Sequence, residues 1–295
     1  MRKGDLDDLV AFAAIARTRS FTRAAAELSL SPSALSHAMK GLESRVGVRL
    51  LARTTRSVSP TPAGERLLSS VEPALKEVEC GLAAMGKWRG TPSGTIRLTT
   101  FSYAAHTVLA TALPRFLKDY PDVSVEVVVD SRLTDLVSNG FDAGIRFGYA
   151  VDQDMVAVPV GPPTRTVIVG SPDYFKSYPR PQTPADLERH NCVNYRQDGS
   201  GGLLTWDFER DGKEIRLRPS GQFVVNDGYL AAAAVLAGAG LGLMLEEHAS
   251  PYLLSGKLIQ VLDEWCAPFP GLHLYYPNRH VTPALRALSE ALRWR

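Results

Sequence analysis

Four polar side chains share one face of a helix that the sequence predicts from Pro32 onward. Ser31 followed by Pro32 favours a helix start, because a serine oxygen caps free N–H groups and proline tolerates the first helical position. The outward face of this helix carries Ser33, Ser36, His37 and Lys40. Hydroxyls, an imidazole and an ammonium near a helix start can hydrogen-bond to an anion such as a phosphate group.

The opposite face of the same helix predicts how these groups are positioned. Leu35, Met39, Leu42 and Val46 recur at spacings typical of one buried stripe. Upstream, Ser20 or Thr22 can cap a short alanine-rich helix over 23–28, and only Ser29 and Leu30 separate the two helices. Two helices joined by so short a turn indicate a helix-turn-helix, whose second helix enters the DNA major groove. We expect a first helix over 5–18, with Asp5 as its cap and an inner face of Leu6, Leu9, Val10 and Ala13.

A basic wing is predicted after Gly47, which should end the helix. The following stretch reads as two short extended runs around a polar turn, and Arg53 and Arg56 lie where a wing would follow the backbone or enter a minor groove. Between Arg17 and Arg56, eight basic residues against two acidic ones give a net charge of +6, whereas the whole chain carries +2. Such charges can simply solvate a helix surface. Together with the capped turn and the buried stripe, however, they favour phosphate binding.

A long helix is predicted from residue 62 to about residue 88. Its apolar residues alternate steps of three and four, as in a coiled-coil seam: Leu68, Val71, Leu75, Val78, Leu82 and Met85. One helix cannot bury such a stripe alone, so we expect a dimerisation helix; the alternative is a helix packed against its own domain. Pro73 inside it should kink the helix or remove a hydrogen bond.

Strands and helices alternate beyond a hinge at residues 90–94. The first strand is expected over 95–101, a fresh helix is expected to begin at Pro114, and a helix is expected over 132–140. This alternation continues to the end of the chain and predicts mostly parallel sheets covered by helices, in two subdomains. Ligands of such sheets bind beyond the carboxyl ends of strands and in the crevice between lobes.

Composition and cysteine usage indicate an ordinary soluble protein. The 295 residues are 45% apolar and 22% charged, and aspartates interrupt the N-terminal apolar run that a signal peptide would need. No stretch approaches the roughly 20 apolar residues of a membrane span. Cys80, Cys192 and Cys266 are far apart, which favours buried structural thiols over a disulfide, a zinc site or redox sensing. We therefore expect a cytoplasmic protein.

Enzyme motifs are not supported by their context. Asp198-Gly-Ser-Gly-Gly resembles a protease nucleophile loop with two letters transposed, but it follows a polar turn and no partner can be placed by spacing. Gly238, Gly240 and Gly242 follow a helix instead of opening one, so they form no dinucleotide loop. A DNA-bending protein that senses nothing is another alternative, although it would leave the long α/β region unexplained.

The whole chain resembles the LysR-type transcriptional regulators. The resemblance lies in SFTRAAAEL and SPSALSHAMKGLESRVGVRLLARTTRSVSPTPAGERLL, and then in LPRFLKDYPDVSVEVVV, FDAGIRFG, GSPDYF and AGAGLGLML. It implies a winged helix-turn-helix domain over 1–61, a linker helix that dimerises over 62–89, and a periplasmic-binding-protein-like effector domain over 90–295. Lobe 1 would comprise about 94–161 and 270–295, and lobe 2 about 162–269. The implied partners are promoter DNA, further copies of the chain in a dimer or tetramer, and RNA polymerase, with a small-molecule effector and no cofactor.

The resemblance also implies a set of functional residues. The candidate DNA-binding residues are Thr22, Arg23, Ser31, Pro32, Ser33, Ser36, His37, Lys40, Arg53 and Arg56. The commoner family pattern has Gln-Pro where this chain has Pro32-Ser33, and arginine where it has His37, so base preference should be weaker or shifted. The candidate effector residues are Thr100, Phe101, Ser102, Arg146, Phe147, Thr164, Asn226 and Asp227. Thr100 and Ser102 stand between a strand and a helix start, where an anion is favoured, and Arg146 could pair with a carboxylate or be structural.

Overall fold

The chain forms two compact units, Met1–Met85 and Gly86–Arg295. The computed structural model describes residues 4–53, 58–84, 91–132, 135–137, 139–152, 154–196, 201–277 and 281–294, except for the side chains of 53, 76, 79, 80 and 82–84. None of the described helices is both long enough and apolar enough to cross a membrane.

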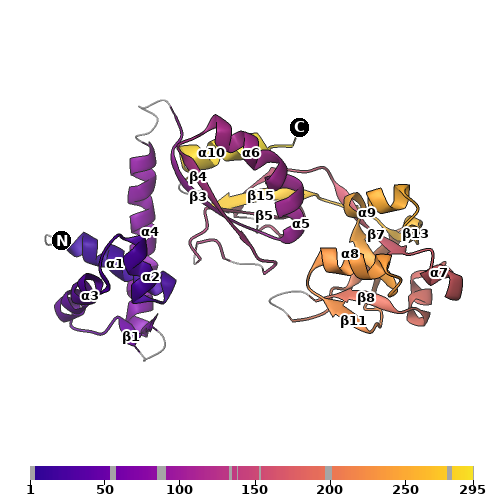
Figure 1. The fold of residues 1–295 in the computed structure, drawn as a ribbon, viewed down its shortest axis with the longest axis horizontal. Helices are drawn as coiled ribbons and strands as arrows, with labels where there is room; N and C mark the ends of the chain where they lie inside the picture. The colour runs from indigo at the N-terminus through magenta and orange to yellow at the C-terminus, as the bar shows by residue number, and fades with distance from the viewer. Residues whose placement is uncertain are drawn as a thin grey trace. The chain divides into compact units, whose positions relative to one another are not determined.

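The first unit is a helical head followed by a long helix (Figure 1). Its elements are α1 (Asp5–Thr18), α2 (Phe21–Glu27), α3 (Pro32–Val46), β1 (Leu51–Arg53), β2 (Val58–Pro60) and α4 (Pro62–Ala84). Strands β1 and β2 pair antiparallel, as expected of a wing. Phe12, Ile15, Leu35 and Met39 are fully buried and hold α1, α2 and α3 together. The predicted helix-turn-helix with a wing is therefore present.

The predicted helix ends are mostly confirmed. The Ser20 hydroxyl accepts from Arg23 N at 3.3 Å and the Ser31 hydroxyl from Ala34 N at 3.1 Å, so both serines cap their helices. Gly47 ends α3 with a φ of 75°, in the left-handed region that suits glycine. The prediction that Asp5 caps α1 is wrong, because Gly4 occupies that position and Asp5 is the first helical residue.

Two predicted apolar faces extend too far. In α3, Val46 is 44% exposed, because it is the last helical residue before the chain turns away at Gly47. In α1, Leu6 is exposed, and the most deeply buried residues are Phe12 and Ile15, which the expected inner face omitted. Leu6 lies in the first turn of its helix, away from the centre of the head.

The apolar stripe of α4 divides between two environments. Leu68 packs against the core of the head and Val71 is buried, so this part of the stripe is covered by its own domain. Leu75 is half-buried, while Val78 is 52% exposed. Pro73 lies inside the helix. The side chain of Leu82 and the whole of Met85 lie outside the described residues.

The first subdomain of Gly86–Arg295 is a five-stranded sheet with helices on one face (Figure 1). The strand order is β4 (Val123–Val129), β3 (Gly94–Thr100), β5 (Ala143–Phe147), β15 (Leu272–Pro277) and β6 (Met155–Pro159). Helices α6 (Ala110–Asp119) and α10 (Pro283–Leu292) cover one face, where Phe116, Leu288 and Leu98 are buried together. Between β3 and α6 lie the short α5 (Ser102–Ala104) and a π-helical turn over Ala105–Leu109.

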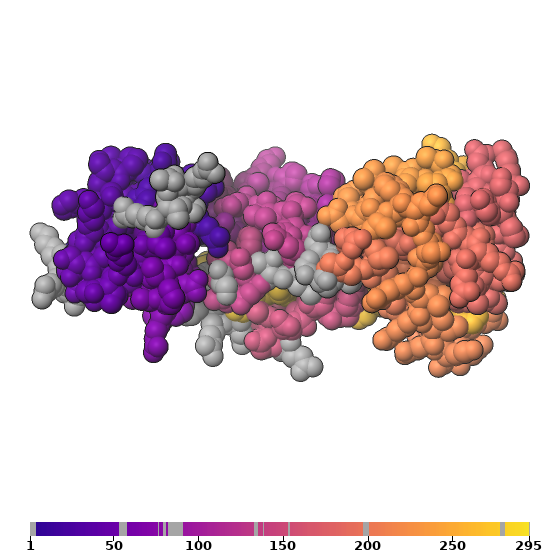
Figure 2. Space-filling model, turned by 90° about the horizontal axis from the view of Figure 1, so that it is seen from below, coloured from indigo at the N-terminus to yellow at the C-terminus, as the bar shows by residue number. Residues whose placement is uncertain are grey.

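The second subdomain is built on a mixed sheet. Its strands are β11 (Phe223–Val225), β8 (Cys192–Tyr195), β12 (Leu241–Leu245), β7 (Thr164–Gly170) and β13 (Ile259–Val261), with β14 (Pro268–Phe269) also paired to β7. Helices α8 (Gly228–Leu236) and α9 (Glu246–Leu254) pack on one face. The hairpin β9 (Trp206–Arg210) and β10 (Lys213–Leu217) packs on the other, together with α7 (Tyr174–Ser177). In the space-filling view the orange part of the chain, which contains α8 and β12, gathers on this subdomain (Figure 2).

Three expectations for this unit are wrong. Pro114 lies inside α6 instead of beginning a helix; the π-helical turn directly precedes the stretch that the proline disturbs. The described residues of 132–140 form turns and bends rather than a helix. The sheets are mixed, because β15 runs antiparallel to β5 and β6, and β7 runs antiparallel to β12 and β13. The chain enters the second subdomain at β7 and returns to the first subdomain at β15.

Candidate DNA interface and effector site

The exposed face of α3 carries the polar groups that the sequence placed there. Ser33, His37 and Lys40 are exposed and Ser36 is half-buried, while Leu35 and Met39 on the opposite face are fully buried. Thr22, Arg23, Ser31 and Pro32 are also exposed, so the structure brings these candidates to one surface around the start of α3. The hydroxyl oxygens of Ser31 and Ser33 are 2.9 Å apart and share a hydrogen bond. This surface offers hydroxyls, an imidazole and cations to a partner.

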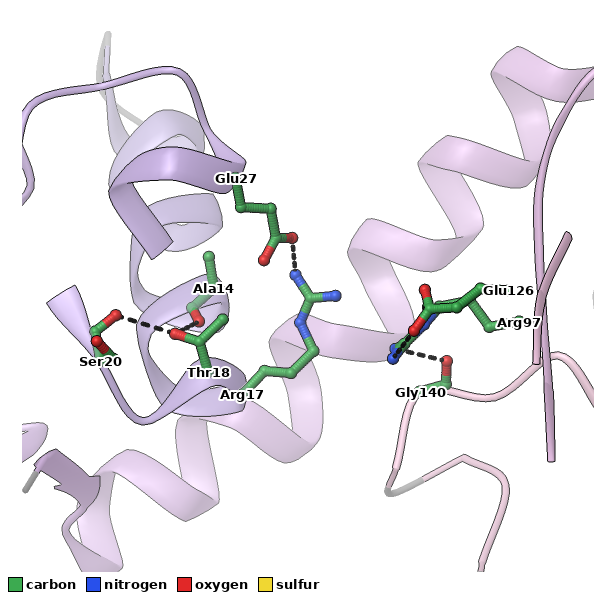
Figure 3. A network of polar contacts seen from close by, with 8 residues as sticks. All are labelled: Ala14, Arg17, Thr18, Ser20, Glu27, Arg97, Glu126 and Gly140. Atoms are coloured by element: carbon green, nitrogen blue, oxygen red, sulfur yellow. Dashed lines mark hydrogen bonds and ion pairs between the residues drawn. The ribbon is translucent and has the colours of Figure 1, made fainter. Parts of the chain in front are cut away.

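Two of the basic residues counted in this region have internal partners. Arg17 forms an ion pair with Glu27, as Figure 3 shows. Arg45 pairs with Asp8, and its Nε lies 3.3 Å from Asp5 Oδ1. These pairs join α1 to α2 and α1 to α3. Arg45 therefore holds the recognition helix α3 against α1. Because Glu27 is already one of the two acidic residues in the count, only the pairing of Arg45 with Asp5 and Asp8 leaves less than the net charge of +6 facing outward.

Glu43 fixes the wing, a role that sequence reasoning missed. Its Oε1 accepts from Leu50 N at 2.8 Å and from Leu51 N at 3.1 Å, which ties the start of β1 to α3. No short motif announces such a bond, because it joins a helix face to a strand across a turn. In the wing itself, Arg53 pairs with Val58 in the antiparallel ladder. The Arg53 side chain and all of Arg56 lie outside the described residues.

The Arg146 side chain is buried and bonded to backbone carbonyl oxygens of three other residues. Only 4% of the residue is exposed, and its guanidinium donates to the carbonyl oxygens of Ile145 at 2.8 Å, Asp130 at 2.8 Å and Arg132 at 3.0 Å. Its Nε has no partner among the described residues. Burial lowers the pKa of Arg146 from its ordinary value. This geometry favours the structural alternative over a carboxylate ligand.

The remaining effector candidates lie in two places, Thr100, Phe101, Ser102 and Phe147 at the ends of β3 and β5, and Asn226 and Asp227 at the start of α8. Thr100 is fully buried and its hydroxyl donates to Ile145 O at 3.5 Å, so in this conformation it faces the protein interior. The rings of Phe101 and Phe147 pack at a tilt of 50° with their centres 5.3 Å apart, and Ser102, the next residue after Phe101, is half-buried. Asp227 caps α8 by accepting from Leu230 N at 2.8 Å, and Asn226 is exposed just before it.

Thr164 belongs to a junction between the subdomains that the sequence did not predict. Its hydroxyl donates to Glu247 Oε2 at 2.7 Å, and the Tyr103 hydroxyl donates to the same oxygen at 3.2 Å. Tyr103 lies in α5 of the first subdomain, while Thr164 and Glu247 lie in the second. Burial, and then the charge of Glu247, raises the pKa of Tyr103, so the phenol remains a donor. Only three-dimensional proximity could reveal this link, since the residues are far apart in sequence.

The described thiols have structural surroundings. Cys192 and Cys266 are both buried and free. Burial raises the pKa of the Cys192 thiol to about 12 and also raises that of Cys266. Because the thiolate is the reactive form, both residues are poor redox sensors in this conformation. The side chain of Cys80 lies outside the described residues.

A buried histidine makes the stability of the second subdomain depend on pH. His190 is 5% exposed, its Nδ1 is 3.0 Å from the Tyr174 hydroxyl, and burial lowers its pKa below the ordinary value of 6.5. As pH falls, the unfolded chain binds the proton first, so the contribution is complete above the ordinary pKa and is lost toward the folded-state pKa. We expect the free energy of unfolding to fall as the pH is lowered through 6.5, the ordinary pKa of the imidazole. His190→Gln should flatten this dependence in urea titrations; an unchanged slope would contradict the assignment.

Comparison with known proteins identifies the chain. Residues 6–65 match the bacterial regulatory helix-turn-helix proteins of the lysR family, and residues 89–295 match the LysR substrate binding domain. The chain belongs to the LysR family of transcriptional regulators. This family carries a helix-turn-helix DNA-binding domain and an effector-binding domain, and it is regulatory rather than enzymatic. The family membership confirms the predicted function as a transcriptional regulator and the prediction that the chain is not an enzyme.

Relatives and solved structures cover the whole LysR-type chain. A putative transcriptional regulator of Pseudomonas aeruginosa is 45% identical over 295 residues, which cover 100% of this chain and 96% of the relative. The HTH-type transcriptional regulator PgrR of Escherichia coli is 42% identical over 296 residues, covering 100% and 99%. The full-length structure of the Vibrio cholerae virulence activator AphB has a TM-score of 0.63 at 24% identity and covers 98% of both chains. CrgA of Neisseria meningitidis has a TM-score of 0.59 at 26% identity over 97% of both.

Proposed function

We propose that this LysR-type regulator binds promoter DNA in the cytoplasm as a dimer, through the exposed face of α3. We also propose that a small molecule held between the two subdomains of Gly86–Arg295 controls it. The observation that carries the proposal is the division of α3 into an exposed polar face and a fully buried apolar face. A helix held in this way presents its N-terminal residues to a groove, as recognition helices do.

The chemistry of the exposed face assigns different roles to its members. His37 and Ser33 can make single hydrogen bonds to base edges, whereas the Lys40 ammonium suits a phosphate. Arg23 and the wing would add contacts to the sugar-phosphate backbone. Because bidentate pairs discriminate bases more strongly than single bonds, this surface should read its site with modest preference.

Substituting His37 and Lys40 separates base reading from backbone binding. We expect His37→Ala to reduce discrimination at one position of each half-site by ~1 to 3 kcal/mol, because a base contact is lost. Lys40→Ala should weaken matched and scrambled DNA alike and reduce the salt slope by about one phosphate contact, because its contact is not base-specific. Fluorescence anisotropy titrations on both DNAs at several salt concentrations measure these quantities. Unchanged discrimination in His37→Ala would remove this residue from the reading set.

The C-terminal half of α4 supports the proposed dimer. The apolar stripe beyond Val71 is only partly covered by its own domain, and Val78 is more than half exposed. A second copy of α4 would bury this part of the stripe and place two heads about a two-fold axis. Assembly of dimers into tetramers and contact with RNA polymerase are further parts of this proposal.

Ligand control requires that the effector bind two states of the regulator with different affinities. The hydrogen bond from Tyr103 to Glu247 supports such a mechanism, because it joins the two subdomains. Glu247 is exposed, so a ligand can reach this link. A ligand that changes this junction would shift the relative position of the subdomains, and hence the geometry of the assembly on DNA.

A further inference from the structure

Glu247 presents a carboxylate oxygen at the junction of the subdomains. Both hydroxyl donors, from Thr164 and Tyr103, reach Oε2, and Oε1 has no partner among the described residues. Glu247 is exposed. Since a carboxylate can accept about four hydrogen bonds, Oε1 is available to a donor that approaches the junction.

Tyr103 brings one aromatic ring to this carboxylate, and further rings from both subdomains gather around His248, the next residue in α9. The His248 ring centre is 4.6 Å from that of Tyr229 and 6.4 Å from those of Tyr103 and Tyr252. His106 lies 5.0 Å from Tyr229. The faces of such rings attract cations, and a cation–π contact strengthens when water is excluded. In the described part of the chain, no arginine or lysine stacks on these three tyrosines; the cation–π contacts found there engage Phe101, Phe141, Phe175 and Trp265.

The charges around the rings favour a cation as well. Asp227 acts electrostatically on both Tyr229 and His248. Burial lowers the pKa of His248, so its ring is neutral at neutral pH and does not repel a positive group. The Arg146 guanidinium lies over the Phe101 ring, and its two terminal nitrogens donate hydrogen bonds to backbone carbonyl oxygens. Two carboxylates, Glu247 and Asp227, therefore outnumber one buried guanidinium, that of Arg146, which favours a cation over the anion that Thr100, Ser102 and Arg146 suggested.

We propose that the effector of this regulator is a small organic cation, an amine on an aromatic or apolar body. Its ammonium group pairs with Glu247 Oε1, and its body packs on Tyr103, Tyr229 and His248. This inference rests on the proposed function, since it names the chemical class of the effector. It also explains why one carboxylate stands among rings that two subdomains supply.

Three probes of similar size that differ in charge test the proposal on the full-length protein: 2-phenylethylamine, 2-phenylethanol and phenylacetate. Isothermal titration should give a Kd for the amine at least about tenfold below those of the alcohol and the acid. Glu247→Gln should abolish this preference, because the amide keeps the size and an acceptor oxygen but loses the charge. Tyr103→Phe should keep part of it, because the ring remains. Glu188→Gln, which changes an exposed glutamate elsewhere in the second subdomain, is the matched control and should bind as the wild type does.

The outcomes separate the ligand class from the regulatory function. Tighter binding of phenylacetate, an amine preference that survives Glu247→Gln, or failure of all three probes to bind would each overturn the cation proposal. None of these results would affect DNA binding by α3, which is measured independently. Amine binding that requires Glu247 but leaves the DNA footprint unchanged would support the ligand class and contradict its coupling to DNA.

Discussion

Val78→Glu should lower the affinity of the full-length chain for its DNA site by about 100-fold or more. Val78 is 52% exposed on the C-terminal half of α4, where the proposed dimer would bury it. Two like charges facing each other in an apolar seam oppose association. A monomer then binds with one head only and loses the gain of about 100-fold or more that a linked second head provides.

The matched control for this variant lies on the other side of the same helix. Ser69 precedes Val78 by nine residues, which places it about 180° away around an α-helix, and it is exposed. Ser69→Glu adds the same charge and should leave both assembly and DNA affinity near the wild-type values. Sedimentation and anisotropy titrations measure the two properties. A Val78→Glu protein that stays dimeric, or a monomer that keeps full affinity, would contradict the assigned role of α4.

Gly64→Ala should destabilise the head by ~1 to 3 kcal/mol. A Cβ on Gly64 would lie 2.1 Å from the Leu50 carbonyl oxygen, which also accepts from Thr61 N at 2.9 Å. The Leu50 carbonyl belongs to the backbone and the new Cβ is attached directly to the backbone of α4, so the clash cannot be relieved without disturbing the junction of the wing and α4. Because Glu43 bonds the same segment to α3, loosening it should also weaken DNA binding.

The same glycine-to-alanine change at Gly81, also in α4, should have the opposite effect on stability. A Cβ there would meet no atom within 4 Å, so Gly81→Ala should stabilise α4 by ~0.5 to 1 kcal/mol through helix propensity. Urea unfolding of the two variants compares them directly. If Gly64→Ala were as stable as the wild type, the close approach of α4 to Leu50 would be wrong.

The sequence predicted best those features that depend on neighbours along the chain. Ser20 and Ser31 act as caps because a serine before a helix can reach only the N–H groups of the next turn, and Gly47 ends α3 because its left-handed φ suits glycine. The buried stripe of α3 followed from helical spacing and failed only at Val46, where the helix ends.

Features that depend on distant segments were predicted poorly. The antiparallel course of β7 and β15 follows from the chain's passage between subdomains, which periodicity does not encode. The sequence marks Arg146 as a candidate, but its bonds to the carbonyl oxygens of Asp130 and Arg132 depend on how the preceding loop folds back onto β5. Tyr103 and Glu247, separated by 144 positions, carried no shared motif.

The central claim, that paired heads read DNA through α3, is tested most directly by selecting genomic DNA fragments with the purified full-length chain and sequencing those retained. The account predicts enriched fragments that share two similar half-sites in inverted orientation, with centres about 10 base pairs or a multiple of that apart. The absence of any enriched sequence, or enrichment of a single half-site without its inverted partner, would contradict it.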